Sequence, residues 1–224
     1  MSNTLQELTV DTLFDLSHTR AAPLLAQATY PWEVLDELGG FIQTLGETLG
    51  EGYRSPAPHV WVHESATVAP TAFLGENVII GPHAEIRHGA FIRGNALVGE
   101  GAVVGNSTEL KNVILFDKVQ VPHYNYVGDS VLGYKAHLGA GAITSNVKSD
   151  KTPVVIHTPY QDLPTGRKKI GAMVGDLVEV GCGSVLNPGT VIGRGTRVYP
   201  LSAVRGYVPP DSIYKKQGEI ALQV

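Results

Sequence analysis

Residues 61–110 read WVHESATVAPTAFLGENVIIGPHAEIRHGAFIRGNALVGEGAVVGNSTEL, and an aliphatic side chain returns at every sixth position of this stretch. A small or β-branched residue lies two positions before most of them. The aliphatic positions are Val62, Val68, Leu74, Ile80, Ile86, Ile92, Val98, Val104 and Leu110. A period of six matches neither the 3.6-residue repeat of an amphipathic helix nor the alternation of a half-exposed strand. The stretch therefore predicts a repeat protein rather than a helical bundle or an ordinary sheet.

The same six-residue pattern returns near the C-terminus. Its later aliphatic members are Val174, Val180, Leu186, Ile192, Val198 and Val204. Glycine often follows the aliphatic residue, as expected where a turn needs unusual backbone angles or close packing. Each hexapeptide is then one short strand plus a turn, and stacked coils cover an apolar face that one coil cannot bury alone. We expect an all-β fold built as a parallel β-helix, with the aliphatic residues in its core.

Two segments break the repeat. Between Leu110 and Leu132 the spacing slips around the sequence VPHYNYVGDS, and residues 145–170, which contain three prolines, leave the pattern. Interruptions of a repeat usually map to loops, and loops often carry the binding residues. The chemistry is therefore expected at these two places.

The ends of the chain predict other structure. We divide it into a helical N-terminal extension (1–57), a β-helix (58–208) with a loop at 145–170, and a C-terminal tail (209–224). Apolar residues spaced by three or four between Trp32 and Leu49 predict a helix, although the Gly39–Gly40 pair argues against its continuity. We expect the helices on or near the N-terminal end of the coil, where they hide an open strand edge, and a short helix in the tail.

Composition excludes several classes of function. A formal charge of −4 over 224 residues gives no overall attraction to nucleic acid or to an anionic membrane. The single cysteine, Cys182, excludes an internal disulfide framework and is typical of a reducing compartment. We find no secretory leader and no apolar run long enough to span a bilayer. We therefore expect a cytoplasmic protein that binds neither nucleic acid nor membrane.

Residues 105–146, GNSTELKNVILFDKVQVPHYNYVGDSVLGYKAHLGAGAITSN, resemble the acetyltransferase half of bifunctional sugar-1-phosphate nucleotidylyltransferases. The similarity continues through TGRKKIGAMVGD at 165–176 and covers about residues 60–205. The resemblance implies a left-handed β-helix, a homotrimer with sites between subunits, and acetyl-CoA as co-substrate without a required metal. No Gly-rich nucleotidylyltransferase motif precedes the repeats, so we do not expect pyrophosphorylase activity.

The resemblance assigns the general base. In the family, the histidine of a PH-x-x-Y motif accepts the proton of the amine that attacks acetyl-CoA, and the match here is His123, with Tyr126 three residues later. The assignment is chemically reasonable because a neutral imidazole accepts a proton near neutral pH. No covalent intermediate is needed for this transfer.

The resemblance also implies binding residues for a phosphorylated amino sugar. Lys111 matches a phosphate-binding lysine, and an arginine from an earlier coil assists it. Arg87 and Arg93 both follow an aliphatic position, and we favour Arg87 for this role.

Further acceptor contacts are implied beyond the coil that holds Lys111. Tyr126 and Asn146 match substrate-contacting residues, and Lys151 lies near the position of another phosphate-binding lysine, with Lys148 as its rival.

Other positions are implied for coenzyme A. Small residues at Gly139, Ala140 and Gly141 allow close approach of the pantetheine arm, and the short basic run Arg167, Lys168 and Lys169 suits the phosphates of the coenzyme. Two positions depart from the family pattern: His137 stands where the bacterial bifunctional enzyme has asparagine, and Cys182 replaces a serine near the coenzyme. We expect Cys182 to be structural.

Two other functions compete with the acetyltransferase. Trimeric left-handed β-helices also include zinc carbonic anhydrases, but His83 and His88 do not fall in phase with that ligand pattern. A non-catalytic trimeric scaffold or regulatory homologue is the second alternative, since fold does not determine function. The identity of the amino sugar and of the acyl group stays open.

Overall fold

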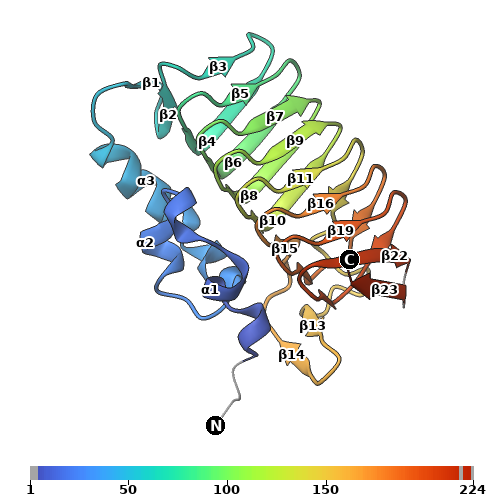
Figure 1. Ribbon diagram of the computed structural model, residues 1–224. Helices are drawn as coiled ribbons and strands as arrows, with labels where there is room; N and C mark the ends of the chain where they lie inside the picture. Colours follow the sequence, from blue (N-terminus) through green and yellow to red (C-terminus); the bar gives the residue numbers. More distant parts are fainter. Residues whose placement is uncertain (1–4, 217–218, 223–224) are drawn as a thin grey trace.

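The computed structural model describes residues 5–216 and 219–222 of the 224-residue chain. A helical extension comes first and a coil of short strands follows it (Figure 1). The helices, with η marking 3₁₀-helices, are η1 (Gln6–Leu8), α1 (Val10–Leu13), η2 (Leu16–His18), α2 (Ala22–Leu25), η3 (Pro31–Asp36) and α3 (Leu38–Thr48).

The coil contains two large sheets of mostly parallel strands. The 12-stranded sheet consists of β1 (Tyr53–Ala57), β2 (Val60–His63), β4 (Phe73–Ile80), β6 (Phe91–Val98), β8 (Glu109–Leu115), β10 (Tyr126–Leu132), β12 (Ile143–Thr144), β15 (Ala172–Val174), β17 (Val185–Leu186), β18 (Thr190–Ile192), β20 (Ala203–Val204) and β21 (Tyr207–Val208). The 9-stranded sheet consists of β3 (Thr67–Val68), β5 (Glu85–Ile86), β7 (Val103–Asn106), β9 (Gln120–His123), β11 (His137–Leu138), β16 (Glu179–Val180), β19 (Arg197–Val198), β22 (Ser212–Lys216) and β23 (Glu219–Leu222).

The strands build a three-sided coil because β4, β6, β8 and β10 each bend across two sides. Their C-terminal halves stack with β2, β15, β18 and β21 on what we call the first side. The 9-stranded sheet is the second side. The N-terminal halves of the long strands stack with β12, β17 and β20 on the third side. The expected all-β, left-handed parallel β-helix with a helical N-terminal extension is confirmed.

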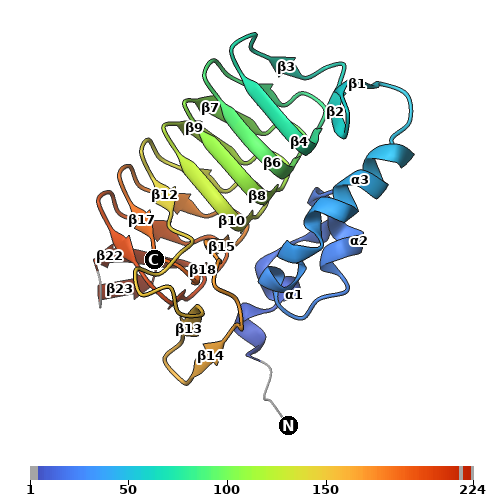
Figure 2. The same ribbon diagram turned by 180° about the vertical axis from the view of Figure 1, so that it is seen from behind.

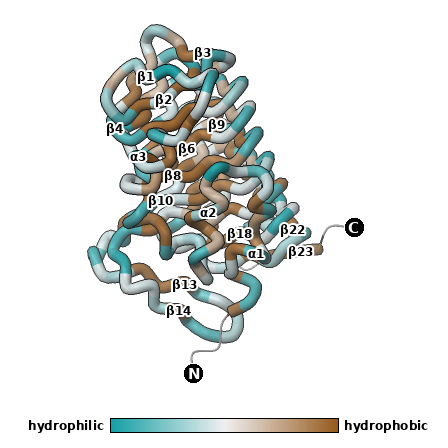
Figure 3. The backbone as a smooth tube through the Cα atoms, turned by 90° about the vertical axis from the view of Figure 1, so that its left-hand side faces the viewer, coloured by the Kyte–Doolittle hydropathy of each residue, from teal (hydrophilic) through white to brown (hydrophobic). Residues whose placement is uncertain are grey.

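The six-residue repeat places one side chain per strand inside this coil. Ile80, Ile86 and Ile92, which lie on three successive sides, are fully buried. Along the chain, hydrophobic and hydrophilic residues alternate over short distances (Figure 3), as expected when neighbouring side chains point to opposite faces of a strand. The core is therefore the narrow interior of the coil, and the positions between its members are available for other roles.

The slip in the repeat has a local cause. Ile92 of β6 pairs with Leu110 of β8, but Gly94 pairs with Lys111, so the register shifts and the backbone of Arg93 has no residue opposite it in β8. Coil neighbours are 18 residues apart before this point, as for Asn77 and Asn95, and 17 residues apart in the coils up to β12, as for Asn112 and Asp129. The spacing returns to 18 residues after the 145–170 segment, in the coils from β15 to β20. The coil continues through the slip, and one side chain is displaced from the ladder at this corner.

The helical extension lies along the first side of the coil. α3 packs against β4, β6 and β8, and η3 packs against β10; Figures 1 and 2 show this from opposite directions. Strand residues that would face solvent, such as Ile79, Leu97 and Ile114, are buried beneath it. This side therefore carries continuous apolar runs, as sheets covered on both faces do. We expected the helices on or near the N-terminal end of the coil, and α3 does lie against the early strands β4 and β6. The expectation that the helices hide the open strand edge was wrong, because β1 pairs antiparallel with β2 at that edge.

Three other predictions about local structure need correction. The apolar pattern from Trp32 to Leu49 forms two helices, η3 and α3, which meet at Glu37. The last residues of the region predicted to be helical form strand β1. The tail forms the antiparallel strands β22 and β23 rather than a helix, since β22 continues the second side of the coil. Residues 217–218 and 223–224 of that tail lie outside the described residues.

Residues 145–170 leave the coil, as predicted. They form an antiparallel hairpin of β13 (Val155–His157) and β14 (Asp162–Pro164). Buried Val154 and Ile156 hold the hairpin against the protein. Ile170 donates its backbone N–H to the carbonyl of Asn146 at 3.1 Å, which brings the two ends of the segment together beside the coil.

Candidate active site

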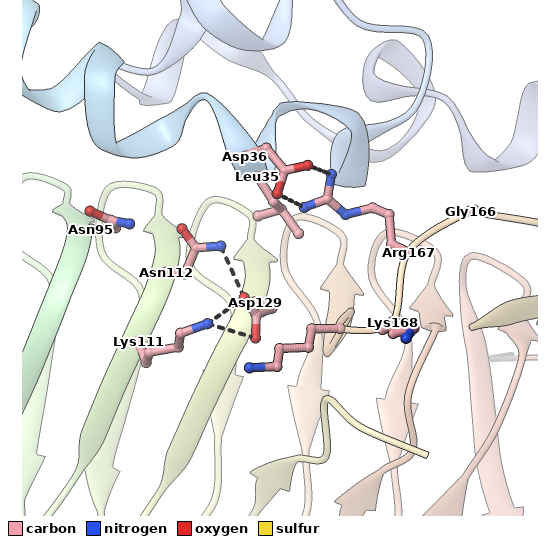
Figure 4. A pocket seen from close by; sticks show the side chains of 10 residues that line it. Leu35, Asp36, Asn95, Lys111, Asn112, Asp129, Gly166, Arg167 and Lys168 are labelled. Atoms are coloured by element: carbon pink, nitrogen blue, oxygen red, sulfur yellow. Dashed lines mark hydrogen bonds and ion pairs between the residues drawn. The ribbon is translucent and has the colours of Figure 1, made fainter. Parts of the chain in front are cut away.

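The corner between the third and first sides carries a buried charge pair. Lys111 lies in the middle of β8, where the strand bends, and its Nζ lies 2.9 and 3.3 Å from the two carboxylate oxygens of Asp129 in β10. Asn112 Nδ2 donates to the same carboxylate at 3.0 Å (Figure 4). Asn112 and Asp129 both adopt positive φ, which asparagine and aspartate tolerate better than most residues. The side chain of Asp129 is only 4% exposed.

Asn146 and Tyr126 extend this pair into a network. Asn146 Nδ2 lies 2.5 Å from Asp129 Oδ2 and 3.2 Å from the Tyr126 hydroxyl. Burial raises the pKa of Tyr126, and the charges of Asp129 and Glu109 raise it further. The hydroxyl of Tyr126 therefore stays protonated through neutral pH. Lys111, Tyr126 and Asn146, which sequence analysis proposed as acceptor contacts, are brought together by Asp129.

A cavity of about 480 Å³ opens beside this network. It lies between the coil corner, the end of η3 and the end of the 145–170 segment (Figure 4). Its lining residues are Leu35, Asp36, Asn95, Lys111, Asn112, Asp129, Gly166, Arg167, Lys168 and Lys169. Four cations and two carboxylates thus surround one small space.

The charges in the cavity are only partly paired. The two Nη atoms of Arg167 lie 2.7 and 2.5 Å from the carboxylate oxygens of Asp36. Lys168 and Lys169 are exposed and make no ion pair within residues 5–216 and 219–222. Because Lys111 and Arg167 already have carboxylate partners, the two following lysines give the cavity an excess of positive charge.

Arg93, rather than Arg87, lies near this cavity. Arg87 forms two hydrogen bonds of 3.0 Å with Glu85 on the second side. Arg93 precedes the residue that pairs with Lys111, and its Nη1 lies 2.9 Å from Glu109. The hydrogen bond that Arg93 donates to Glu109 raises the pKa of Arg93, with small contributions from the charges of Tyr126 and Asp129. The geometry thus favours the arginine that sequence analysis ranked second.

His123 lies at a different corner, between the second and third sides. It is an exposed residue at the end of β9, and its backbone N–H donates to Asn125 Oδ1 at 3.0 Å. The buried Asn125 amide also donates to the carbonyls of Gly139 and Ala142, at 2.9 Å each. The N–H of Gly141 donates to the His123 carbonyl at 3.0 Å. His123 is therefore adjacent to Gly139–Gly141, the segment proposed for the pantetheine arm.

The remaining predicted binding residues are distributed differently from our expectation. Lys148 contacts Thr152 and Asp150 within the 145–170 segment, and neither it nor Lys151 lines the cavity that contains Lys111. Arg167 and Lys168 line that cavity, whereas Gly139–Gly141 form the corner at His123. One subunit therefore does not assemble the predicted coenzyme residues into a single site.

The two departures from the family pattern lie on the second side or beside it. His137 Nδ1 is 2.7 Å from Glu179 Oε2 in the next coil. Cys182 is an exposed free thiol whose backbone N lies close to Gly139. Within the described residues, no group of three histidine, cysteine or acidic side chains is arranged to hold a metal ion. Among them, no helix is both long and apolar enough to cross a membrane.

Sequence reasoning missed two charged residues of the cavity: Asp36 and Asp129. Asp129 lies in the VGDS segment where the repeat slips, so the slip itself marked its position. Asp36 carries no signal in the sequence, because only the docking of the extension brings it to the cavity.

Comparisons with known proteins agree with this architecture. The family model described as "GMPPB C-terminal domain" matches residues 77–158. The bifunctional protein GlmU of Methanococcus maripaludis is 29% identical over 196 residues, which are 86% of this chain and 47% of that protein. The bifunctional sugar-1-phosphate nucleotidylyltransferase/acetyltransferase of Sulfurisphaera tokodaii is 32% identical over 109 residues, 49% of this chain and 27% of that protein. The chain spans less than half the length of these two relatives.

Among solved structures, a hexapeptide transferase family protein from Anaplasma phagocytophilum matches with a TM-score of 0.42 and 18% identity. The match covers 74% of this chain and 80% of that one. The stacked six-residue strands make the chain a hexapeptide-repeat protein, and its sequence is similar to the bifunctional sugar-1-phosphate nucleotidylyltransferase/acetyltransferases.

Proposed function

We propose that the protein is an acetyl-CoA-dependent N-acetyltransferase that acts on an amino-sugar 1-phosphate. The observation that carries this proposal is the network of Lys111, Tyr126 and Asn146 around Asp129. Lys111, Tyr126 and Asn146 come from three successive coils, and the resemblance to bifunctional acetyltransferases assigns acceptor binding to them. A cavity with excess positive charge lies beside them and suits a phosphorylated ligand.

The acceptor phosphate has several cations within this region. Lys168 and Lys169 line the cavity without a carboxylate partner among the described residues, and Arg93 lies on the adjoining coil. Lys111 keeps its position through Asp129, so its ammonium is already ordered before the ligand arrives. A phosphate bound here directs the sugar ring along the third side, where Tyr126 and Asn146 offer hydrogen-bonding groups.

The chemical step is a direct transfer. The amine nitrogen of the acceptor attacks the thioester carbonyl carbon of acetyl-CoA, and the carbon–sulfur bond then breaks. His123 accepts the amine proton, and coenzyme A leaves as a thiolate that takes up a proton. His123 suits this role because its side chain is exposed beside Gly139–Gly141, where small residues leave room for the coenzyme.

A homotrimer is part of the proposal because His123 and the Lys111 network lie at opposite ends of the third side. The outward residues of that side stack in register from coil to coil. Phe73, Phe91, Tyr126, Ile143 and Val185 form an apolar stripe, which Glu109 interrupts between Phe91 and Tyr126. Phe73 is 56% exposed and Phe91 is 42% exposed. A second copy packed on this apolar stripe covers it and encloses the space between the two corners.

The decisive experiment measures release of coenzyme A from acetyl-CoA with a panel of amino-sugar phosphates. We expect His123→Ala to lower kcat about 100-fold or more, the range for loss of a general base. His88→Ala is the matched control, because His88 lies at the same corner two coils earlier and should leave turnover unchanged. Absence of turnover with every acceptor favours a non-catalytic scaffold, and full activity of His123→Ala rejects the base assignment.

A further inference from the structure

The end of η3 forms one wall of the cavity beside Lys111. The helix is fixed at its start, where the Glu33 carboxylate accepts the N–H groups of Thr29 and Tyr30 at 2.9 Å each. Trp32 and Leu35 are buried, and η3 packs on β10. The last residue of this anchored helix therefore has a defined position above the coil corner.

That last residue, Asp36, holds Arg167. The pair has two contacts, of 2.7 and 2.5 Å, and the partners differ in environment: the Arg167 side chain is 18% exposed and the Asp36 side chain is 81% exposed. The Nε atom of Arg167 is buried and has no hydrogen-bond partner. The guanidinium thus lies enclosed at the cavity, with both of its terminal nitrogens directed to the extension.

Arg167 in turn determines the path of the segment that lines the cavity. Its carbonyl accepts the N–H of Val154 at 2.7 Å, and three residues later the N–H of Ile170 donates to the carbonyl of Asn146. Lys168 and Lys169 lie between these two anchors. Because only these two residues separate Arg167 from Ile170, the position of Arg167 limits which part of the cavity the two lysine side chains can reach.

We propose that the N-terminal extension is a component of the acceptor site, and that Asp36 is a positioning residue which acts through Arg167. Asp36 orders Arg167, and Arg167 orders the two lysines that face the phosphate. This inference rests on the proposed function, since it assigns the extension a role in binding the phosphorylated acceptor. The extension is then more than a cover for the apolar first side.

The test compares Asp36→Asn with Glu37→Gln in the full chain. Asp36 and Glu37 are adjacent, and each variant removes one carboxylate charge. Glu37 differs from Asp36 because it makes no side-chain hydrogen bond or ion pair within the described structure. We expect Asp36→Asn to raise the KM for glucosamine 1-phosphate about twofold to fivefold, the range supported by exposed ion pairs, with the KM for acetyl-CoA unchanged. Glu37→Gln should behave as wild type.

A double-mutant cycle separates positioning from a general change in charge. If Asp36 acts through Arg167, Asp36→Asn should add nothing to the effect of Arg167→Gln. The same comparison is made by equilibrium titration of glucosamine 1-phosphate without acetyl-CoA, so the inference survives if the ligand binds but no acetyl group is transferred. Additive effects, an unchanged Asp36→Asn variant, or absence of glucosamine 1-phosphate binding to wild type each overturn it.

Discussion

The carboxylate of Asp129 is almost entirely buried and accepts hydrogen bonds from Lys111, Asn112 and Asn146. A buried charge is costly unless it is paired and hydrogen-bonded, and three donors meet this requirement. The three donors depend on Asp129 in turn, because their side chains lose their common acceptor when the carboxylate is removed. Asp129 therefore couples the stability of the corner to the placement of Lys111 and Asn146, the groups proposed to bind the acceptor.

Asp129→Asn tests this coupling. Asparagine tolerates the positive φ of this position, but its amide presents only one acceptor oxygen and places N–H groups near the donors. We expect the free energy of unfolding to fall by about 1–3 kcal/mol and the acceptor KM to rise, with little change in the acetyl-CoA KM. Chemical denaturation and steady-state kinetics measure the two effects.

Asp150→Asn provides the comparison for Asp129→Asn. Asp150 is an exposed carboxylate in the 145–170 segment, and its hydrogen bonds are to nearby residues of that segment. Equal acceptor KM values for the two variants would show that burial and the network at Asp129 do not matter for binding.

The limits of sequence reasoning differ among these residues. Lys111, Tyr126 and Asn146 were identified because they lie in a stretch that resembles known acetyltransferases. Their common partner, Asp129, was not, because a buried carboxylate is recognised by its partners in space. The choice between Arg87 and Arg93 also required the structure, since both follow an aliphatic position and only the register shift distinguishes them.

At the scale of elements, the coil was readily predicted because an aliphatic residue recurs at every sixth position. The sequence predicted that glycines serve turns or close packing, but it did not show which of the two applies at a given position. Gly105 does not have positive φ; instead, a Cβ at this position would overlap the backbone of Pro122 in the next coil. The placement of the helices could not be predicted, since it depends on contacts such as that of Gly46 with Trp61.

Two glycine substitutions test these different roles. Gly105→Ala forces Pro122 and the neighbouring coil apart, and we expect a loss of about 1–3 kcal/mol of stability. Gly40→Ala, in α3, should stabilise by about 0.5–1 kcal/mol, because no atom lies within 4 Å of the added Cβ and alanine favours the helix. Urea unfolding midpoints of the two variants should move in opposite directions, and a shift in the same direction would contradict the packing argument.

At the scale of the whole molecule, the three-sided coil separates two groups of residues that we propose to be functional. His123 and Gly139–Gly141 lie where the second side meets the third, and the Lys111 network lies where the third meets the first. The helical extension covers the first side, so this side is not free to receive another subunit. The third side joins the two corners and keeps exposed aromatic residues. The proposed trimer contact is therefore assigned to this side.

The double variant Phe73→Arg/Phe91→Arg tests the contact. The two rings lie 5.5 Å apart between centroids, on adjacent coils, and a subunit contact that buries them should be prevented by two charged side chains. In analytical ultracentrifugation we expect wild type at three times the mass of the chain and the variant as a monomer. Acetyl transfer should fall to background with it, while circular dichroism stays unchanged.

Leu177→Arg is the control for this experiment. Leu177 is also an exposed apolar residue, but it lies at the corner between β15 and β16, opposite the third side. The Leu177→Arg variant should therefore remain trimeric and active. If Phe73→Arg/Phe91→Arg also remains trimeric, the third side is not the contact. If wild type is an active monomer, one subunit contains the complete site. The bound acceptor and acetyl-CoA must then reach from the Lys111 corner to the His123 corner without a second subunit.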